Sequence, residues 1–272
     1  MKKLNLWLLA SLFVASFTLT SCSDDDDPVT PDVPNATDIT VDDLVGTWTM
    51  ATTDNSITYT FTKTELTISY AGQEPRYKGP YTLADGEISY GQDNSVAGSY
   101  SYPETYSIGL LRDKAVLVLK TFAETPDGVK YEELAMILYK QGKTISTNTS
   151  EIQGSWHWYM HGSTDYIRTG LKFEGSNFEL VITPWGEKYV GTYNYANGIL
   201  TLNVSAGYTS RQAGTGYGSG AGSLDPATLE GTWNTLDREN WHVDAVSGSP
   251  FIVNGTEAYG CVANLMCIYH KK

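Results

Sequence analysis

Four histidines are the first residues whose chemistry could define a function. His157 and His161 stand four positions apart, a spacing that brings two metal ligands together on a helix. Both follow Trp156 on a segment predicted as a β-strand, where four residues span about 13 Å, too far for one metal ion. His242 and His270 are isolated in the sequence. The sequence therefore predicts no metal site and no cofactor.

Three carboxylates lie near two tryptophans towards the C-terminus. Glu230, Asp237 and Glu239 are close in sequence to Trp233 and Trp241. A carboxylate pair flanked by aromatic rings would suit a sugar hydrolase, but a solvated loop explains the same residues. No serine stands in a nucleophile elbow, and no reactive cysteine has an evident histidine partner. We therefore expect a protein that is not an enzyme and has no catalytic residues.

Two cysteines lie near the C-terminus. Residues 258–270, AYGCVANLMCIYH, are predicted as one strand that carries both Cys261 and Cys267. Six residues of strand separate them by roughly 20 Å, whereas a disulfide needs Cα atoms within about 7 Å. We expect two free, buried cysteines.

The N-terminus carries an export signal. Two lysines precede an apolar run at 4–17, which is shorter than the roughly 20 residues of a membrane-spanning helix. Residues 1–21 are therefore predicted to be a signal peptide. Leu19-Thr20-Ser21-Cys22 resembles the lipobox of bacterial lipoproteins, which implies cleavage before Cys22 and a diacylglycerol anchor on its sulfur.

An acidic tether follows at 22–41. Asp24 to Asp27 form a solvated, self-repelling run, and 28–40 hold three prolines without apolar periodicity. The acidic run resembles the export signal of Bacteroides-type surface lipoproteins. That resemblance implies an outer-membrane protein held by its lipid and exposed on the cell surface; the periplasmic face is the alternative.

Composition favours an all-β protein. Loss of Lys2 and Lys3 with the signal takes the formal charge from −13 to −15, which disfavours nucleic acid and anionic membrane surfaces as partners. Glycine (26) and tyrosine (19) are abundant, and short β-rich runs alternate with Gly, Asn and Asp turns.

An internal repeat divides the chain. Four blocks recur in order, which predicts domains at 42–142 and 151–272 joined by a polar connector. The pairs are Leu44–Trp48 with Ile152–Trp156, Phe61–Ile68 with Phe173–Leu180, Tyr77–Gly86 with Tyr189–Gly198, and Leu134–Tyr139 with Asn264–Tyr269.

Each repeat contains a predicted hairpin. Tyr77 to Leu83 alternate with period two, which predicts a half-buried strand. Asp85-Gly86 and Asn197-Gly198 follow, and such pairs favour tight turns because both central positions need a positive φ. About eight short strands per repeat can protect their edges by closing into a barrel.

The start of each repeat resembles the lipocalin-like domain. Gly46-x-Trp48 and Gly154-x-Trp156 match its opening motif, which implies a glycine that lets the chain bend and a tryptophan that plugs the closed end. The whole arrangement resembles the lipocalin-like lipoproteins of Bacteroides-type bacteria. The expected fold is all-β, with two tandem antiparallel meander β-barrels. The second repeat departs by a Gly-rich insertion near 211–242, where a third Gly-Thr-Trp at 231–233 is explained as inserted sequence or coincidence.

Ligand-binding candidates come from the tyrosines. Tyr81, Tyr193 and Tyr195 are expected to face inward, and Trp185 lies in a turn where it could stack on a sugar or fold over a barrel end. We expect a binding module for a small amphipathic or glycan ligand. The alternative is a surface scaffold with filled barrels that binds a protein partner.

Overall fold

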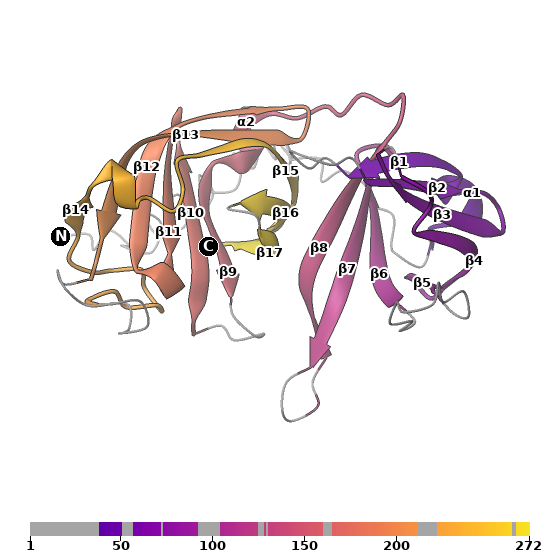
Figure 1. The fold of residues 1–272 in the computed structure, drawn as a ribbon, viewed down its shortest axis with the longest axis horizontal. Coiled ribbons are helices and arrows are strands. Elements are labelled where there is room, and N and C mark those ends of the chain that lie inside the picture. Colours follow the sequence, from indigo (N-terminus) through magenta and orange to yellow (C-terminus); the bar gives the residue numbers. More distant parts are fainter. Residues whose placement is uncertain are drawn as a thin grey trace, which may run out of the picture. The chain divides into compact units, whose positions relative to one another are not determined.

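The computed structural model describes residues 38–50, 57–71, 73–91, 104–124, 128, 130–159, 165–211, 222–262 and 265–272 (Figure 1). The chain divides into a unit of residues 1–32 and a unit of residues 33–272, and all described residues belong to the second unit. The predicted signal peptide, Cys22 and the aspartate run therefore lie outside the described residues.

The first eight strands form a closed antiparallel barrel, called barrel 1 (Figure 1). Each strand pairs with the next along the chain, and β1 pairs with β8 to close the ring. Helix α1 (Val41–Leu44) precedes it. The strands are β1 (Gly46–Met50), β2 (Ile57–Phe61), β3 (Glu65–Tyr70), β4 (Tyr77–Ala84), β5 (Glu87–Tyr90), β6 (Glu104–Leu111), β7 (Val116–Glu124) and β8 (Lys130–Lys140).

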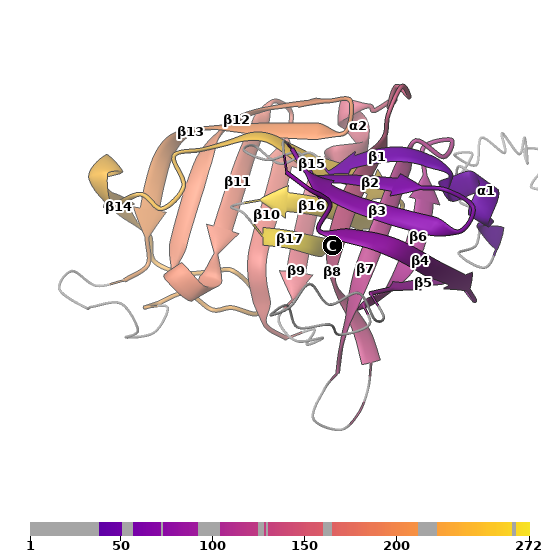
Figure 2. The ribbon, with the colours of Figure 1, turned by 45° about the vertical axis from the view of Figure 1, so that its right-hand side comes forward.

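A second closed antiparallel barrel, barrel 2, follows helix α2 (Thr149–Ile152) (Figure 2). Its ring closes through the pairing of β17 with β9, and β14 adds to the end of β13. Its elements are β9 (Gly154–Tyr159), β10 (Ile167–Glu174), β11 (Asn177–Ile182), η2 (Thr183–Trp185), β12 (Glu187–Ala196), β13 (Ile199–Thr209), β14 (Asn234–Leu236), η3 (Arg238–Asn240), β15 (Ala245–Asn254), β16 (Glu257–Val262) and β17 (Leu265–Lys271). The all-β fold of two tandem barrels is as predicted.

The predicted hairpins are confirmed. Asp85 and Gly86 have φ of 53° and 77°, and Asn197 and Gly198 have φ of 55° and 75°. Positive φ at both central residues is the signature of the type I′ turn, whose twist matches that of the flanking strands. The turns fix the register of β4 with β5 and of β12 with β13.

The two barrels carry the same contacts at the end where β1 and β9 begin, which is called the closed end. The indole N–H of Trp48 donates to the carbonyl of Leu44 at 2.7 Å, and that of Trp156 donates to the carbonyl of Ile152 at 2.7 Å. Both tryptophans are fully buried. Each indole thus satisfies a carbonyl at the C-terminal end of the short helix that precedes its barrel.

Glycine and lysine complete the closed end of each barrel. Gly46 and Gly154 have φ of 132° and 105°, a backbone conformation that L side chains rarely adopt. Lys140 places its Nζ 4.9 Å from the ring centre of Trp48, and Lys271 places its Nζ 5.2 Å from that of Trp156.

These lysines correct the fourth block of the predicted repeat. Lys140 pairs with Trp48 and Lys271 pairs with Trp156, so the two final strands correspond one residue away from the predicted alignment. The residue of barrel 1 that is equivalent to Cys267 is therefore Met136, and not Ile137 as the sequence alignment predicts. Met136 and Cys267 both pack in a barrel core, whereas Ile137 faces outward.

The prediction of one strand at 258–270 was wrong. The segment is a hairpin, in which β16 ends at Val262 and β17 begins at Leu265. Gly260 pairs with Cys267 and Cys261 pairs with Met266. Because successive residues of a strand face opposite sides, the two cysteines point to opposite faces. Both are free, as predicted, but only Cys267 is buried, whereas Cys261 is partly exposed. Orientation rather than distance along a strand keeps them apart.

Side chains pack the interior of both barrels. In each barrel the inward residues form one contiguous hydrophobic cluster. Trp48, Phe61 and Leu66 are among the fully buried side chains of barrel 1, and Trp156 and Phe173 are among those of barrel 2. This packing supplies most of the apolar burial that stabilises each barrel.

A third hydrophobic cluster joins the outer faces of the two barrels, where β16 and β17 lie against β8. The Tyr139 hydroxyl crosses this interface and donates to the carbonyl of Gly198 at 2.8 Å. Burial raises the Tyr139 pKa, so the hydroxyl keeps its proton. The buried members are Leu111, Ala115, Val116, Val118, Ala135, Ile137, Ile145, Ile252, Tyr259 and Ile268.

A turn between β6 and β7 adds polar contacts to the interface. Arg112, Asp113 and Lys114 have φ of 54°, 52° and 61°. Three successive non-glycine residues in the left-handed region are costly and need compensation from their surroundings. The Arg112 guanidinium donates to Glu151 of α2 at 2.9 Å and to the carbonyl of Val253 of β15 at 2.8 Å.

Candidate functional site

The predicted ligand-binding tyrosines lie at the closed ends, where their hydroxyls have protein partners. Tyr81 donates to the carbonyl of Thr62 at 2.8 Å. Tyr193, its counterpart in barrel 2, donates to the carbonyl of Gly175 at 2.8 Å. Both rings pack on their barrel cores. These hydroxyls therefore join strand-connecting turns to the barrel walls.

Tyr195 is also committed to a structural contact. It is 4% exposed, and its hydroxyl donates to Glu151 at 2.9 Å. Glu151 in turn accepts from Arg112 of barrel 1. Burial, followed by the charge of Glu151, raises the Tyr195 pKa, so the phenol stays protonated and acts as a donor.

Trp185 alone among the four candidates lies at the end of barrel 2 away from Trp156, which is called its open end. It ends η2, is half-buried and packs against the barrel core. Its ring lies 5.1 Å from that of His242, with 39° between the planes. Of the two placements left open by the sequence, the structure shows the one that folds over the barrel.

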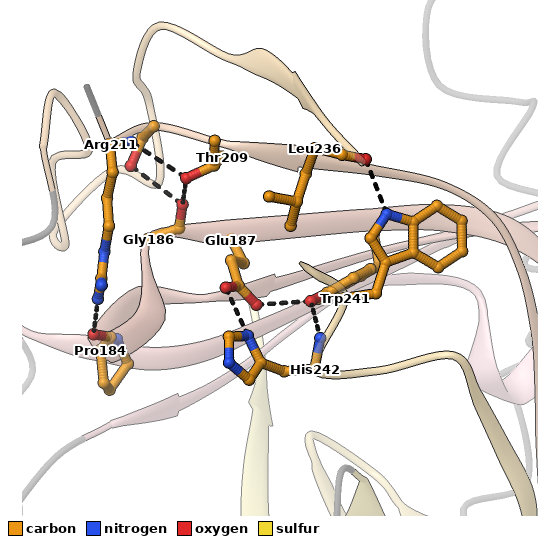
Figure 3. Close-up of polar contacts among 10 residues, drawn as sticks. Pro184, Gly186, Glu187, Thr209, Arg211, Leu236, Trp241 and His242 are labelled. Atoms are coloured by element: carbon orange, nitrogen blue, oxygen red, sulfur yellow. Dashed lines mark hydrogen bonds and ion pairs between the residues drawn. The ribbon is translucent and has the colours of Figure 1, made fainter. Parts of the chain in front are cut away.

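His242 belongs to a polar cluster at this open end (Figure 3). The Glu187 carboxylate, only 8% exposed, lies 2.7 Å from His242 Nδ1. Its second oxygen accepts from the Tyr189 hydroxyl at 2.5 Å. That hydroxyl accepts from the main-chain N–H of His242 at 2.9 Å. The cluster thus ties the inserted segment to the start of β12.

The protonation of the cluster follows from its contacts. Burial, then the hydrogen bond to Glu187, raises the Tyr189 pKa, so the phenol acts as the donor. The carboxylate oxygens of Glu187 act as acceptors, so His242 Nδ1 is the donor in their 2.7 Å hydrogen bond. Trp241 packs edge-on against Tyr189 at 6.2 Å and donates its indole N–H to the carbonyl of Leu236 at 2.8 Å.

The other residues considered for chemistry are dispersed. Glu230, Asp237 and Glu239 are all exposed. His157 is 5% exposed on the outer face of β9, opposite exposed His270; His161 lies outside the described residues. Across the described part of the chain, no three His, Cys, Asp or Glu side chains form a group that could hold a metal ion.

A groove of about 360 Å³ lies on the outer face of barrel 2 and crosses β10 to β13. Its apolar lining residues are Val190, Gly191 and Phe178, and its remaining lining side chains are polar or charged. The polar set is Lys172, Glu174, Asn177, Glu179, Thr192 and Ser205.

A β-bulge shapes this groove. The pairing of β12 with β13 shifts between Val190 and Gly191, as an extra residue in one strand requires. A Cβ on Gly191 would lie 1.9 Å from the carbonyl oxygen of Asn203 and 3.0 Å from the Phe178 ring. Only glycine fits there, because any side chain would clash with the main chain of β13 and crowd the core ring of Phe178.

An aromatic surface continues from the groove. Glu179 of the groove lies 3.8 Å from Lys188. The Lys188 ammonium is 4.8 Å from the ring centre of Trp233 and 5.5 Å from that of Tyr208. The third Gly-Thr-Trp of the sequence therefore supplies an aromatic ring beside the groove.

Sequence reasoning missed both the cluster and the groove. Glu187 and His242 are 55 positions apart and belong to no recurring motif. The bulge at Gly191 was not predicted, because the first repeat has Gly79 at the equivalent position and the glycine therefore did not set the second repeat apart. A polar residue at the buried first position of β12 was the only available signal for Glu187.

Comparison with known proteins gives no relatives: the sequence matches no family model, and none of the curated proteins is significantly similar to it. Among the described residues, no helix has both the length and the apolar character needed to cross a bilayer.

Proposed function

We propose that this chain is a non-enzymatic, lipid-anchored binding protein of the cell surface, which binds a saccharide in the outer groove of barrel 2. The groove carries the proposal. Its volume of about 360 Å³ falls at the lower end of the roughly 300–1,000 Å³ typical of small-molecule sites. The anchor at Cys22 and the surface location rest on the N-terminal sequence.

The lining suits a sugar because it combines apolar residues with hydrogen-bonding ones. The C–H face of a pyranose ring can rest on the partly exposed side chain of Val190. Its hydroxyls both donate and accept, and the groove offers acceptors such as Glu179 and donors such as Lys172, with Asn177 able to serve as both. A longer chain would continue towards Trp233.

A blocking variant tests this proposal. Thr192→Trp places an indole in the groove from an exposed position of β12. Thr82→Trp makes the same change at an exposed position of β4 in barrel 1. On a glycan array and by calorimetry, Thr192→Trp should bind at least about 10-fold more weakly than the wild type, while Thr82→Trp should bind normally. No bound glycan, or equal binding by all three proteins, would refute the proposal.

A protein partner is the second candidate, favoured by the packed interiors of both barrels. A scaffold needs a rigid outer surface and no internal cavity. Crosslinking on intact cells distinguishes the two functions, because a protein partner that docks elsewhere should be captured equally by the wild type and Thr192→Trp.

A further inference from the structure

A buried carboxylate at the open end of barrel 2 is not required by the fold. Glu187 corresponds through the repeat to Pro75, an exposed residue in barrel 1. Barrel 1 closes without an acidic group at that place. Taking a carboxylate out of water is costly unless it is paired, so its presence in barrel 2 alone calls for a purpose beyond closure.

Glu187 contacts a planar nitrogen ring, and that ring lies beside an aromatic one. One oxygen lies 2.7 Å from a ring nitrogen of His242, and the other accepts the Tyr189 hydroxyl at 2.5 Å. The Trp185 ring lies 5.1 Å from the imidazole. A carboxylate hydrogen-bonded to a nitrogen heterocycle and an aromatic ring beside it are two contacts that recognise planar nitrogen cations.

We propose that the open end of barrel 2 binds ligands bearing an imidazolium or guanidinium group, and that His242 fills this site as an internal occupant. The site uses residues other than those of the saccharide groove. His242 is carried by the inserted segment, whose neighbouring residues 237–240 are all exposed. A competing cation would take the place of the imidazole on Glu187 and release that segment.

The side chain that fills the site can be deleted and replaced in solution. His242→Ala in the full-length chain removes the imidazole and leaves Glu187, Tyr189 and Trp185 in place. Free imidazole, at millimolar concentration, should raise the melting temperature of this variant by several degrees and change its tryptophan fluorescence. The wild type, whose site is filled, should respond at least about 10-fold more weakly.

A second variant assigns the effect to the carboxylate. In His242→Ala/Glu187→Gln, imidazole affinity should fall at least 10-fold relative to His242→Ala. Equal imidazole affinity in the single and double variants would overturn the proposal, as would the absence of any response in a folded His242→Ala chain.

A measurement on the wild type covers the case in which His242→Ala does not fold. The main-chain N–H of His242 donates to Tyr189 and should exchange slowly. Excess methylguanidinium, below denaturing concentration, should speed exchange at His242 and leave the N–H of Trp48 in barrel 1 unchanged. Unaltered exchange at His242 would overturn the proposal.

Discussion

Barrel 1 and barrel 2 agree at their closed ends and differ at their open ends. Trp48 and Trp156 make the same hydrogen bond at the same distance. At the other end, Tyr189 joins a buried glutamate to an exposed histidine, whereas its counterpart Tyr77 donates to the nearby carbonyl of Pro80. The shared end specifies the fold, and the end that differs carries the residues that distinguish one barrel's chemistry from the other's.

The comparison also shows how one turn serves both barrels. Asp43 in α1 and Glu151 in α2 occupy matching positions before the two closed ends. Lys114 reaches Asp43 at 2.5 Å, and Arg112 from the same turn reaches Glu151 at 2.9 Å. One turn of barrel 1 thus supplies the basic partner for both repeats, which gives the left-handed backbone there a structural reason.

The largest expected effect tests the equality of the closed ends. Trp48→Ala and Trp156→Ala each remove a fully buried indole, and each should lower the free energy of unfolding by about 3–5 kcal/mol. Guanidinium unfolding followed by circular dichroism measures both. Trp233→Ala, at a half-buried site on the outer surface, should cost less than about 1 kcal/mol. A large difference between the two core variants would break the comparison.

The next effect tests whether the barrels unfold together. Ile268 is 3% exposed in the inter-barrel cluster, so Ile268→Asp buries an unpaired charge and should cost about 3 kcal/mol. The wild type should unfold in a single transition, which should split into two in Ile268→Asp. His270→Asp, two residues along on the same face but exposed, should change stability by less than about 0.5 kcal/mol. One unsplit transition in Ile268→Asp would show that the interface does not couple the barrels.

The features that the two barrels share could be predicted from the sequence, whereas those that differ between them could not. Gly46-x-Trp48 and Asp85-Gly86 act through neighbouring residues and recur, so short windows revealed them. The Glu187–His242 contact depends on a long insertion without a counterpart in barrel 1. The hairpin of β16 and β17 was missed because no glycine or proline marks a turn between Val262 and Leu265.

A smaller effect sharpens the contrast between the open ends. Tyr189→Phe leaves the buried Glu187 carboxylate with one partner fewer and should cost about 2 kcal/mol. Tyr77→Phe removes a hydrogen bond in an exposed setting and should cost less than about 0.5 kcal/mol. Thermal unfolding of both variants measures the difference. Equal costs would mean that the Glu187 cluster adds nothing to barrel 2 beyond what barrel 1 already has.

The smallest expected effect is a difference between the two barrels in how their free energy of unfolding depends on pH. Burial, and secondarily the charge of Lys272, lowers the pKa of His157 below 6.5, so the unfolded chain binds the proton more readily than the folded one. Stability from this group is complete above about pH 6.5 and declines as the pH falls, by at most about 1.4 kcal/mol per unit. His157→Gln, which does not titrate, should flatten that slope in unfolding curves between pH 7 and 5.

Barrel 1 should respond only in stronger acid. The hydrogen bond from Lys114, followed by that from the Thr40 main chain, lowers the Asp43 pKa to about 2. Its contribution is present above the ordinary value near 3.8 and is lost as the pH falls through 2. Asp43→Asn should therefore flatten the slope below pH 4 and leave the slope between pH 7 and 5 intact. If Asp43→Asn instead altered the slope of stability between pH 7 and 5, the loss of stability in acid could not be assigned separately to the two barrels.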